Sequence, residues 1–297
     1  MSVLSPLLLY GRMIKFSHSV FALPFAFSGA ALAVATHGIQ PSRLLWIVVA
    51  MVGARSAAMG FNRLVDRHID AANPRTAQRE LPAGTMSVLS VSLLVILSSA
   101  LLVLASWQLN PLCLLLSPLA LAVVLMYSYT KRFTWASHLF LGVALALAPL
   151  GAWIAVTGHF DLAPVVLGLA VMSWVAGFDV LYSCQDYDYD RQAGLYSIPV
   201  RFGLLGALRL ARVLQALAVV CMVGVGVIAG LQVVYFIGVA AIACLLAYEH
   251  RLVSPEDLTQ VNTAFMTMNS LVSVAFFAFT LADLLWMGDA SSDWILP

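Results

Sequence analysis

The side chains best suited to chemistry are carboxylates that gather in two short segments of the chain. Of the fourteen acidic residues, three lie within 66–80 and four within 179–190. In the first segment Asn62, Asp66 and Asp70 recur every four residues, so a helix stacks them on one face. Like charges at this spacing repel one another, and we therefore expect the stacked carboxylates to bind a cation.

The candidate ligand atoms in this first segment are all oxygens, and this indicates which cation they bind. Carboxylate and amide oxygens without histidine or cysteine suit Mg²⁺ far better than zinc. Protein-bound Mg²⁺ usually completes its shell with water and substrate phosphate, so the segment predicts a site for Mg²⁺ and a diphosphate. The alternative is a solvated helix end whose aspartates only form ion pairs with Arg63, Arg67 or Arg75.

Two arginines after the first segment favour the phosphate interpretation. Arg75 and Arg79 stand four residues apart in a polar loop. Guanidinium groups form paired hydrogen bonds with phosphate oxygens. We therefore expect this loop to contact a phosphate group.

The second acidic segment repeats the pattern of the first. If the preceding helix continues to residue 190, Asp179, Asp186 and Asp190 share one face. Tyr182 flanks that face, whereas Asp188 points the other way as a solvated charge. Asp179 follows an apolar run, where a carboxylate is costly without a counter-ion. We expect Asp179, Asp186 and Asp190 to bind metal or phosphate.

The composition places these segments in a membrane protein. The chain has 297 residues, of which 62% are hydrophobic and 10% charged, against about 25% charged in an ordinary soluble domain. Its mean hydropathy is +0.95, which excludes a soluble enzyme. A net charge of +1 argues against a nucleic-acid partner. The four cysteines occur singly, without a spacing that binds zinc or an iron–sulfur cluster.

The apolar stretches predict an all-α integral membrane protein, with nine transmembrane helices bundled around a central cavity. A span needs about 20 apolar residues, and one domain, 1–297, accounts for the chain. The predicted spans are 16–37, 43–61, 87–106, 111–129, 137–157, 163–183, 207–229, 232–248 and 261–287.

The basic residues predict the orientation of these spans. With the N-terminus in the cytoplasm, every lysine and arginine except Arg43 and Arg55 lies on the inner side. This distribution follows the positive-inside rule. Both acidic segments then lie at the cytoplasmic face, although about four spans separate them in sequence.

At these positions the sequence resembles the UbiA superfamily of intramembrane aromatic prenyltransferases, over nearly the whole chain. Residues 62–70 resemble its NDxxDxxxD signature, and 179–190 resemble its second aspartate-rich motif. Residues 127–134 resemble its YxxxK segment, and Arg55 stands where the family has an arginine seven residues before the asparagine.

The resemblance implies roles for individual residues. Mg²⁺ and the prenyl diphosphate are then held by Asn62, Asp66, Asp70, Asp179 and Asp186, and the phosphates contact Arg75, Arg79 and Lys131. It also implies that Tyr127 lies beside the reacting carbon and that Arg55 faces the carboxylate of the aromatic acceptor.

The implied activity is Mg²⁺-dependent transfer of a polyprenyl group from polyprenyl diphosphate to a ring carbon of an aromatic hydroxy acid. In the family this step serves ubiquinone or menaquinone biosynthesis, here at the cytoplasmic side of a bacterial inner membrane. The sequence departs from the signature at Arg63, where the family usually has Asp; on a helix this position lies about 100° from the Asn62 face. The departure suggests a subgroup with a different acceptor.

Two acceptors fit this likeness. Residues 13–25 and 182–186 resemble a subgroup often described as hydroxybenzoate polyprenyltransferases, which implies 4-hydroxybenzoate. Part of that subgroup is associated with the futalosine route to menaquinone, where the acceptor is 1,4-dihydroxy-6-naphthoate. His18 and His68 are candidate acceptors of the ring proton, although histidines more often only pack or face solvent.

A secondary transporter is the alternative of a different class. It also has apolar spans, a pseudo-repeat and a few carboxylates within the membrane. Transporters more often place those carboxylates singly near the bilayer midplane. The gathering of acids and arginines at one face favours the enzyme.

Overall fold

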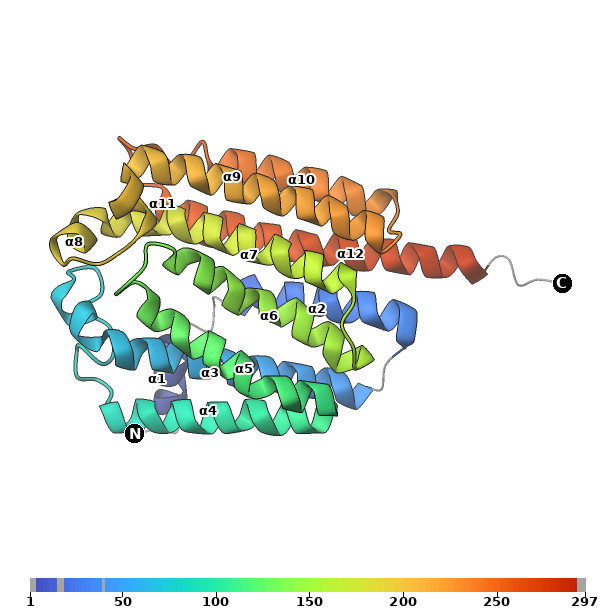
Figure 1. Ribbon diagram of the computed structural model, residues 1–297, viewed down its shortest axis with the longest axis horizontal. Coiled ribbons are helices and arrows are strands. Elements are labelled where there is room, and N and C mark those ends of the chain that lie inside the picture. Colours follow the sequence, from blue (N-terminus) through green and yellow to red (C-terminus); the bar gives the residue numbers. More distant parts are fainter. Residues whose placement is uncertain (1–3, 15–18, 39–40, 293–297) are drawn as a thin grey trace.

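The computed structural model describes residues 4–14, 19–38 and 41–292, and within these ranges the chain is helical without strands (Figure 1). The N-terminal half contains α1 (Leu4–Met13), α2 (Ser19–His37), α3 (Pro41–Ala72), α4 (Val88–Leu109), α5 (Pro111–Thr130) and α6 (Ser137–Thr157). The C-terminal half contains α7 (Leu162–Ser183), the 3₁₀ turn η2 (Cys184–Asp186), α8 (Tyr187–Gln192), α9 (Ile198–Ile228), α10 (Val233–Glu249), α11 (Val261–Thr263), the π-helical η3 (Ala264–Met268) and α12 (Asn269–Ser292).

The prediction of an all-α membrane protein is confirmed. Seven helical segments are long and apolar enough to cross a membrane, and α2 and α10 supply shorter apolar helices. Each of the nine predicted spans coincides with one of these segments, while the number that cross the bilayer stays a prediction. Span 16–37 begins outside the described residues, since α2 is described from Ser19.

Polar residues between the apolar stretches set where helices begin and end. The Ser87 side chain accepts a hydrogen bond from the Ser90 amide and so caps α4. Asn110 caps α5 in the same way, and Pro111 fits the first turn because that turn needs no amide donor there. Gly158 ends α6 at a φ of 78°, a left-handed conformation that glycine adopts without a steric penalty.

The helix α7 is the centre of the bundle. It packs between α6 and α9. Of the residues in the 18-residue apolar segment of the helical run Leu162–Gln192, 67% are buried inside the protein, a larger share than in any other candidate span of the described residues. Trp174 and Val175 are fully buried. This packing fixes the position of Asp179 near the end of the same helix.

The helix expected through the second acidic segment runs over Leu162–Gln192, with a 3₁₀ turn in its path. α7 ends at Ser183, η2 covers Cys184–Asp186, and α8 begins at Tyr187. The side chains of Ser183 and Cys184 both bond to the carbonyl of Val180, and such side-chain bonds compete with regular helical ones. Asp179 lies on α7, Asp186 on η2 and Asp190 on α8, and Asp190 has Asp186 and His138, the partner of Asp179, as electrostatic neighbours.

A buried polar cluster joins α7, α9, α10 and α12. The carboxylate of Glu249 accepts hydrogen bonds from Gln215 at 2.8 Å and from Asn269 at 2.7 Å. Asn269 in turn accepts one from the indole of Trp174 at 2.8 Å. Glu249 is 0% exposed, so these bonds replace the water it lacks.

The close approach of α6 and α7 depends on Gly142. A Cβ atom at this position meets the backbone carbonyl of Met172. We expect Gly142→Ala to destabilise the protein by about 1–3 kcal/mol, the usual cost of overpacking. The midpoint of thermal unfolding of the purified protein in detergent measures the loss.

Gly151→Ala is the matched control on the same helix, because no heavy atom lies within 4 Å of its added Cβ. Its unfolding midpoint should equal that of the wild type or exceed it. Equal midpoints for the two variants would show that the helices do not pack as closely as described.

Candidate active site

The two acidic segments meet at one end of the bundle. The loop after α3 and the segment η2–α8 both lie at the left of Figure 1. The side chain of Asn73 donates a hydrogen bond to Asp186 at 3.1 Å, and the Tyr189 hydroxyl donates one to the carbonyl of Ile69 at 2.9 Å. Residues more than 100 positions apart are thus joined directly.

Asp66 forms the densest group of contacts in this region. It is 1% exposed, and its carboxylate pairs with Lys131 at 2.7 Å and with Arg132 at 3.0 Å. The amide of Asn62 donates a further bond to it at 3.0 Å. Lys131 is the residue that the family resemblance indicated, whereas Arg132 was missed; its place beside Lys131 in the basic pair was the available signal.

Asp70, one helical turn further along α3, pairs with Arg79. The Nη1 atom of Arg79 lies 2.7 Å from one carboxylate oxygen and 2.8 Å from the other. Asp70 is 3% exposed. The hydroxyl of Thr76 also donates to the Asp70 carbonyl at 3.0 Å, which holds the loop against the end of α3.

Asp186 binds the other arginine of the loop. Arg75 forms two parallel bonds to its carboxylate, one of them 2.8 Å long from Nε. Arg75 also donates to the Tyr182 hydroxyl at 2.9 Å. Burial lowers the pKa of Arg75, but the hydrogen bond to Asp186 and the neighbouring Tyr182 outweigh it and raise that pKa above its ordinary value. The guanidinium is therefore firmly charged.

Asp179 pairs with a histidine that the sequence analysis missed. The Nδ1 atom of His138 lies 2.7 Å from Asp179 Oδ2, and the Ile198 amide donates to His138 Nε2 at 3.4 Å. Because Nε2 accepts the hydrogen bond from the Ile198 backbone amide, the ring proton is on Nδ1, and His138 donates it to the carboxylate of Asp179. A lone histidine in an apolar helix gave no sequence signal for this role.

Tyr127 lies between the two acidic segments. It is within electrostatic range of Asp66 from the first segment and of Asp179 from the second. Arg55 is within the same range of Tyr127. Asp190 has Asp186 and Lys131 as charged neighbours. The structure therefore brings the described candidate residues of both acidic segments together at one end of the bundle.

The donor chemistry of this region fits a hard divalent cation. Carboxylate and amide oxygens predominate, which suits Mg²⁺. Among the described residues, no three His, Cys, Asp or Glu side chains converge on one point. Lysine, arginine or histidine partners engage Asp66, Asp70, Asp179 and Asp186 instead.

Of the two histidines that are candidate acceptors of the ring proton, the structure describes only His68. His68 is exposed on α3, whereas Asp66 and Asp70 on the same helix are buried. His18 lies outside the described residues.

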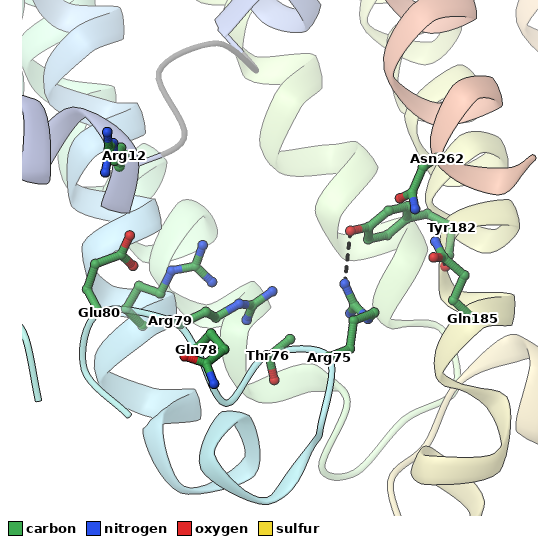
Figure 2. Close-up of a pocket in the computed structure, with 10 residues that line it drawn as sticks. Arg12, Arg75, Thr76, Gln78, Arg79, Glu80, Tyr182, Gln185 and Asn262 are labelled. Carbon is green, nitrogen blue, oxygen red and sulfur yellow. Dashed lines mark hydrogen bonds between the residues drawn. The ribbon is translucent and has the colours of Figure 1, made fainter. Parts of the chain in front are cut away.

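A basic cavity of about 450 Å³ opens beside these ion pairs (Figure 2). Figure 2 shows Arg75 joined to the Tyr182 hydroxyl by its hydrogen bond, with Arg79 further along the same loop and Arg12 on α1. The lining residues are Arg12, Arg63, Arg75, Thr76, Gln78, Arg79, Glu80, Tyr182, Gln185 and Asn262. Four arginines and a single acid give the cavity a positive charge that suits an anion.

Comparison with known proteins agrees with this geometry. The sequence profile of the UbiA prenyltransferase family matches residues 22–271. The 4-hydroxybenzoate octaprenyltransferase of Shewanella frigidimarina is 28% identical over 284 residues, covering 95% of this chain and 99% of that protein. These matches favour the enzyme over the transporter.

Solved structures share the fold. The apo structure of a UbiA homologue from Aeropyrum pernix K1 is 34% identical, covers 90% of this chain and 98% of its own, and has a TM-score of 0.82. A UbiA homologue from Archaeoglobus fulgidus bound to DMAPP and Mg²⁺ is 21% identical, covers 93% and 99%, and has a TM-score of 0.71. At that identity the second likeness concerns the fold alone.

Neutralising Asp66 should destabilise the protein. Asp66→Asn keeps the shape of the side chain but leaves Lys131 and Arg132 without their shared carboxylate. We expect a loss of about 1–3 kcal/mol, less than the 3–5 kcal/mol of a fully buried pair, because both cations are partly exposed. Thermal unfolding in detergent measures this change.

Asp188→Asn serves as the control, because Asp188 is exposed. Its unfolding midpoint should match that of the wild type. If Asp66→Asn also unfolds at the wild-type temperature, the ion pairs around Asp66 do not contribute to stability.

Proposed function

Because the chain belongs to the UbiA prenyltransferase family, we propose that this enzyme transfers a polyprenyl group from polyprenyl diphosphate to a ring carbon of 4-hydroxybenzoate, within quinone biosynthesis. The observation that carries this proposal is the arginine-lined cavity beside two facing groups of carboxylates. The name of the Shewanella frigidimarina relative supports the choice of acceptor. The immediate product is then the prenylated hydroxybenzoate, and ubiquinone is the expected end product of the route.

The basic side chains bind the diphosphate and stabilise it as a leaving group. Arg75, Arg79 and Lys131 are each paired with a carboxylate and can turn toward phosphate oxygens without leaving the region. As the bond between carbon and oxygen breaks, negative charge accumulates on the diphosphate. Fixed cations placed there lower the barrier, because they stabilise the charge that develops in the transition state.

A divalent cation belongs to the proposal. Asn62, Asp66, Asp70, Asp179, Asp186 and Asp190 are the candidate ligands, and their oxygen donors suit Mg²⁺. When bound, Mg²⁺ supplies Lewis-acid stabilisation of the leaving diphosphate. The cations now paired with these carboxylates are then available to the phosphates.

Arg55 and Tyr127 are the proposed residues for binding and orienting the aromatic acceptor. Arg55 pairs with the acceptor carboxylate and so orients the ring, while Tyr127 lies beside the reacting carbon and steadies the allylic cation. The ring carbon next to the phenolic hydroxyl attacks the cation, and loss of the ring proton restores aromaticity. Orientation of this kind converts a bimolecular step into one within a single complex.

Water must be kept from the allylic cation, because water converts it to an alcohol. The apolar helices around the site provide a dry environment, and the long prenyl chain lies against them in the lipid. The positive-inside distribution supports placing the site at the cytoplasmic side of a bacterial inner membrane.

A second acceptor, 1,4-dihydroxy-6-naphthoate, is favoured by one departure from the family signature. Arg63 replaces the usual aspartate next to Asn62, which suggests a different acceptor, and residues 13–25 and 182–186 resemble a subgroup of which part acts in menaquinone synthesis by the futalosine route. The chemistry is the same, since both acceptors carry a carboxylate and an electron-rich ring.

A product assay decides between the acceptors. Membranes containing the protein are incubated with Mg²⁺, a polyprenyl diphosphate and either 4-hydroxybenzoate or 1,4-dihydroxy-6-naphthoate, and the products are identified by mass. We expect an adduct of the prenyl group with one acceptor, lost on addition of EDTA. Absence of an adduct with every aromatic acceptor would refute the proposal.

Asp66→Ala and Asp179→Ala in the same assay test the metal assignment. Each variant should form no detectable product, whereas Asp188→Asn should retain wild-type activity. Full activity in both alanine variants would exclude Asp66 and Asp179 as metal ligands.

His138 provides a separate test, because it positions Asp179 without being a candidate ligand. His138→Leu removes the hydrogen bond to the carboxylate, and loss of such a partner typically costs about 10–100-fold in metal affinity or activity. The Mg²⁺ concentration for half-maximal activity should rise accordingly. His138→Gln retains a donor and should be affected less.

His68→Leu is the control for this series, since His68 is exposed. An unchanged Mg²⁺ requirement in His138→Leu would show that His138 does not position Asp179.

A further inference from the structure

Arg63 occupies a position in the cavity where the family signature has an acid. The residue belongs to α3, is 3% exposed and contributes to the cavity lining. An arginine in place of an aspartate changes the local charge by two units. The resemblance to the family therefore offers no role for this side chain, and its surroundings must indicate one.

Arg63 differs from the two arginines of the loop in its hydrogen bonds. Arg75 donates to Asp186 and Tyr182, and Arg79 donates to Asp70. Within the part of the chain that the structure describes, Arg63 takes part in no ion pair. Its Nε atom is buried without a hydrogen-bond acceptor.

A buried guanidinium in this state is energetically unfavourable. Burying a charge costs free energy unless a partner of opposite sign or hydrogen-bond acceptors compensate. Arg79, of the same sign, is the charged neighbour with the largest effect on Arg63, and neither of the nearby acids, Asp70 and Glu80, forms an ion pair with Arg63; Asp70 is paired with Arg79 instead. An anion in the cavity would supply the missing acceptors and relieve the repulsion.

The walls of the cavity select a phosphate over the aromatic acceptor. The lining contains no aliphatic side chain, and Tyr182 is its one aromatic residue. An aromatic acid brings an apolar ring that needs apolar contacts, whereas a diphosphate presents several charged oxygens. Four guanidinium groups around about 450 Å³ match the second ligand, because each can form paired bonds with phosphate oxygens.

We propose that Arg63 is a direct phosphate ligand, and that with it this cavity binds a diphosphate anion without a divalent cation. The inference rests on the proposed function in taking the diphosphate of the prenyl donor as the natural ligand. It goes further by assigning the residue that departs from the family signature. Charge supplied by Arg63 replaces part of the charge that a metal ion otherwise supplies.

Binding of inorganic pyrophosphate in EDTA tests the proposal. The full-length protein in detergent is titrated by calorimetry, and its thermal unfolding is followed with and without pyrophosphate. The wild type should bind and unfold at a higher temperature when the ligand is present. Arg63→Gln should bind at least tenfold more weakly, as expected when a charge-assisted hydrogen bond is lost.

Two further variants accompany the measurement. Arg67→Gln, on the same helix, changes an exposed arginine that bonds to the Leu64 carbonyl, and it should bind pyrophosphate like the wild type. Arg63→Lys keeps the charge but loses the forked geometry, so its affinity should be intermediate. It also provides the comparison if Arg63→Gln does not fold.

Several results would overturn the inference. It fails if pyrophosphate binds the wild type only with Mg²⁺, or if Arg63→Gln and Arg63→Lys both bind it as tightly as the wild type. Selective loss of 4-hydroxybenzoate binding in Arg63→Gln would instead make Arg63 a ligand of the acceptor. Failure of the proposed function is distinguishable, because it appears as absent prenyl transfer in a wild type that still binds pyrophosphate through Arg63.

Discussion

A carboxylate in a poorly solvated end of a membrane bundle requires a cation, and this requirement organises the site. Asp66 and Asp70 are nearly inaccessible to solvent and are held by cations from other segments. Asp186 binds Arg75 across the interface between the two halves. Two of these pairs, Asp66–Lys131 and Asp186–Arg75, join distant parts of the chain, and Asp70–Arg79 holds the loop after α3 against that helix.

The apolar bundle supplies the rigid frame for these charges. The central helix α7 carries Asp179, and His138 on the adjacent α6 fixes the orientation of that carboxylate. Deeper in the protein, the cluster around Glu249 links four helices through hydrogen bonds. Apolar side chains make up most of this interior, which leaves surroundings dry enough for the reactive carbocation of the proposed reaction.

In the proposed reaction the same basic side chains bind first carboxylates and then phosphates. Arg75, Arg79 and Lys131 neutralise carboxylates in this structure and are also the candidate phosphate ligands. If the diphosphate binds together with a divalent cation, the basic side chains would pair with phosphate oxygens and the carboxylates with the cation. Arg63 differs because it has no carboxylate to leave, and it is therefore available to an anion from the start.

The sequence alone determined the fold class and most of the candidate site, because hydrophobic length and helical spacing are local properties. Asn62, Asp66 and Asp70 lie along one helix as their four-residue spacing requires. The 3₁₀ turn at Cys184–Asp186 escaped prediction, since the side chains of Ser183 and Cys184 bond to the Val180 carbonyl there. Only the tertiary structure decided the partners, His138 for Asp179 and Arg132 for Asp66, because contacts between distant segments depend on how the helices pack.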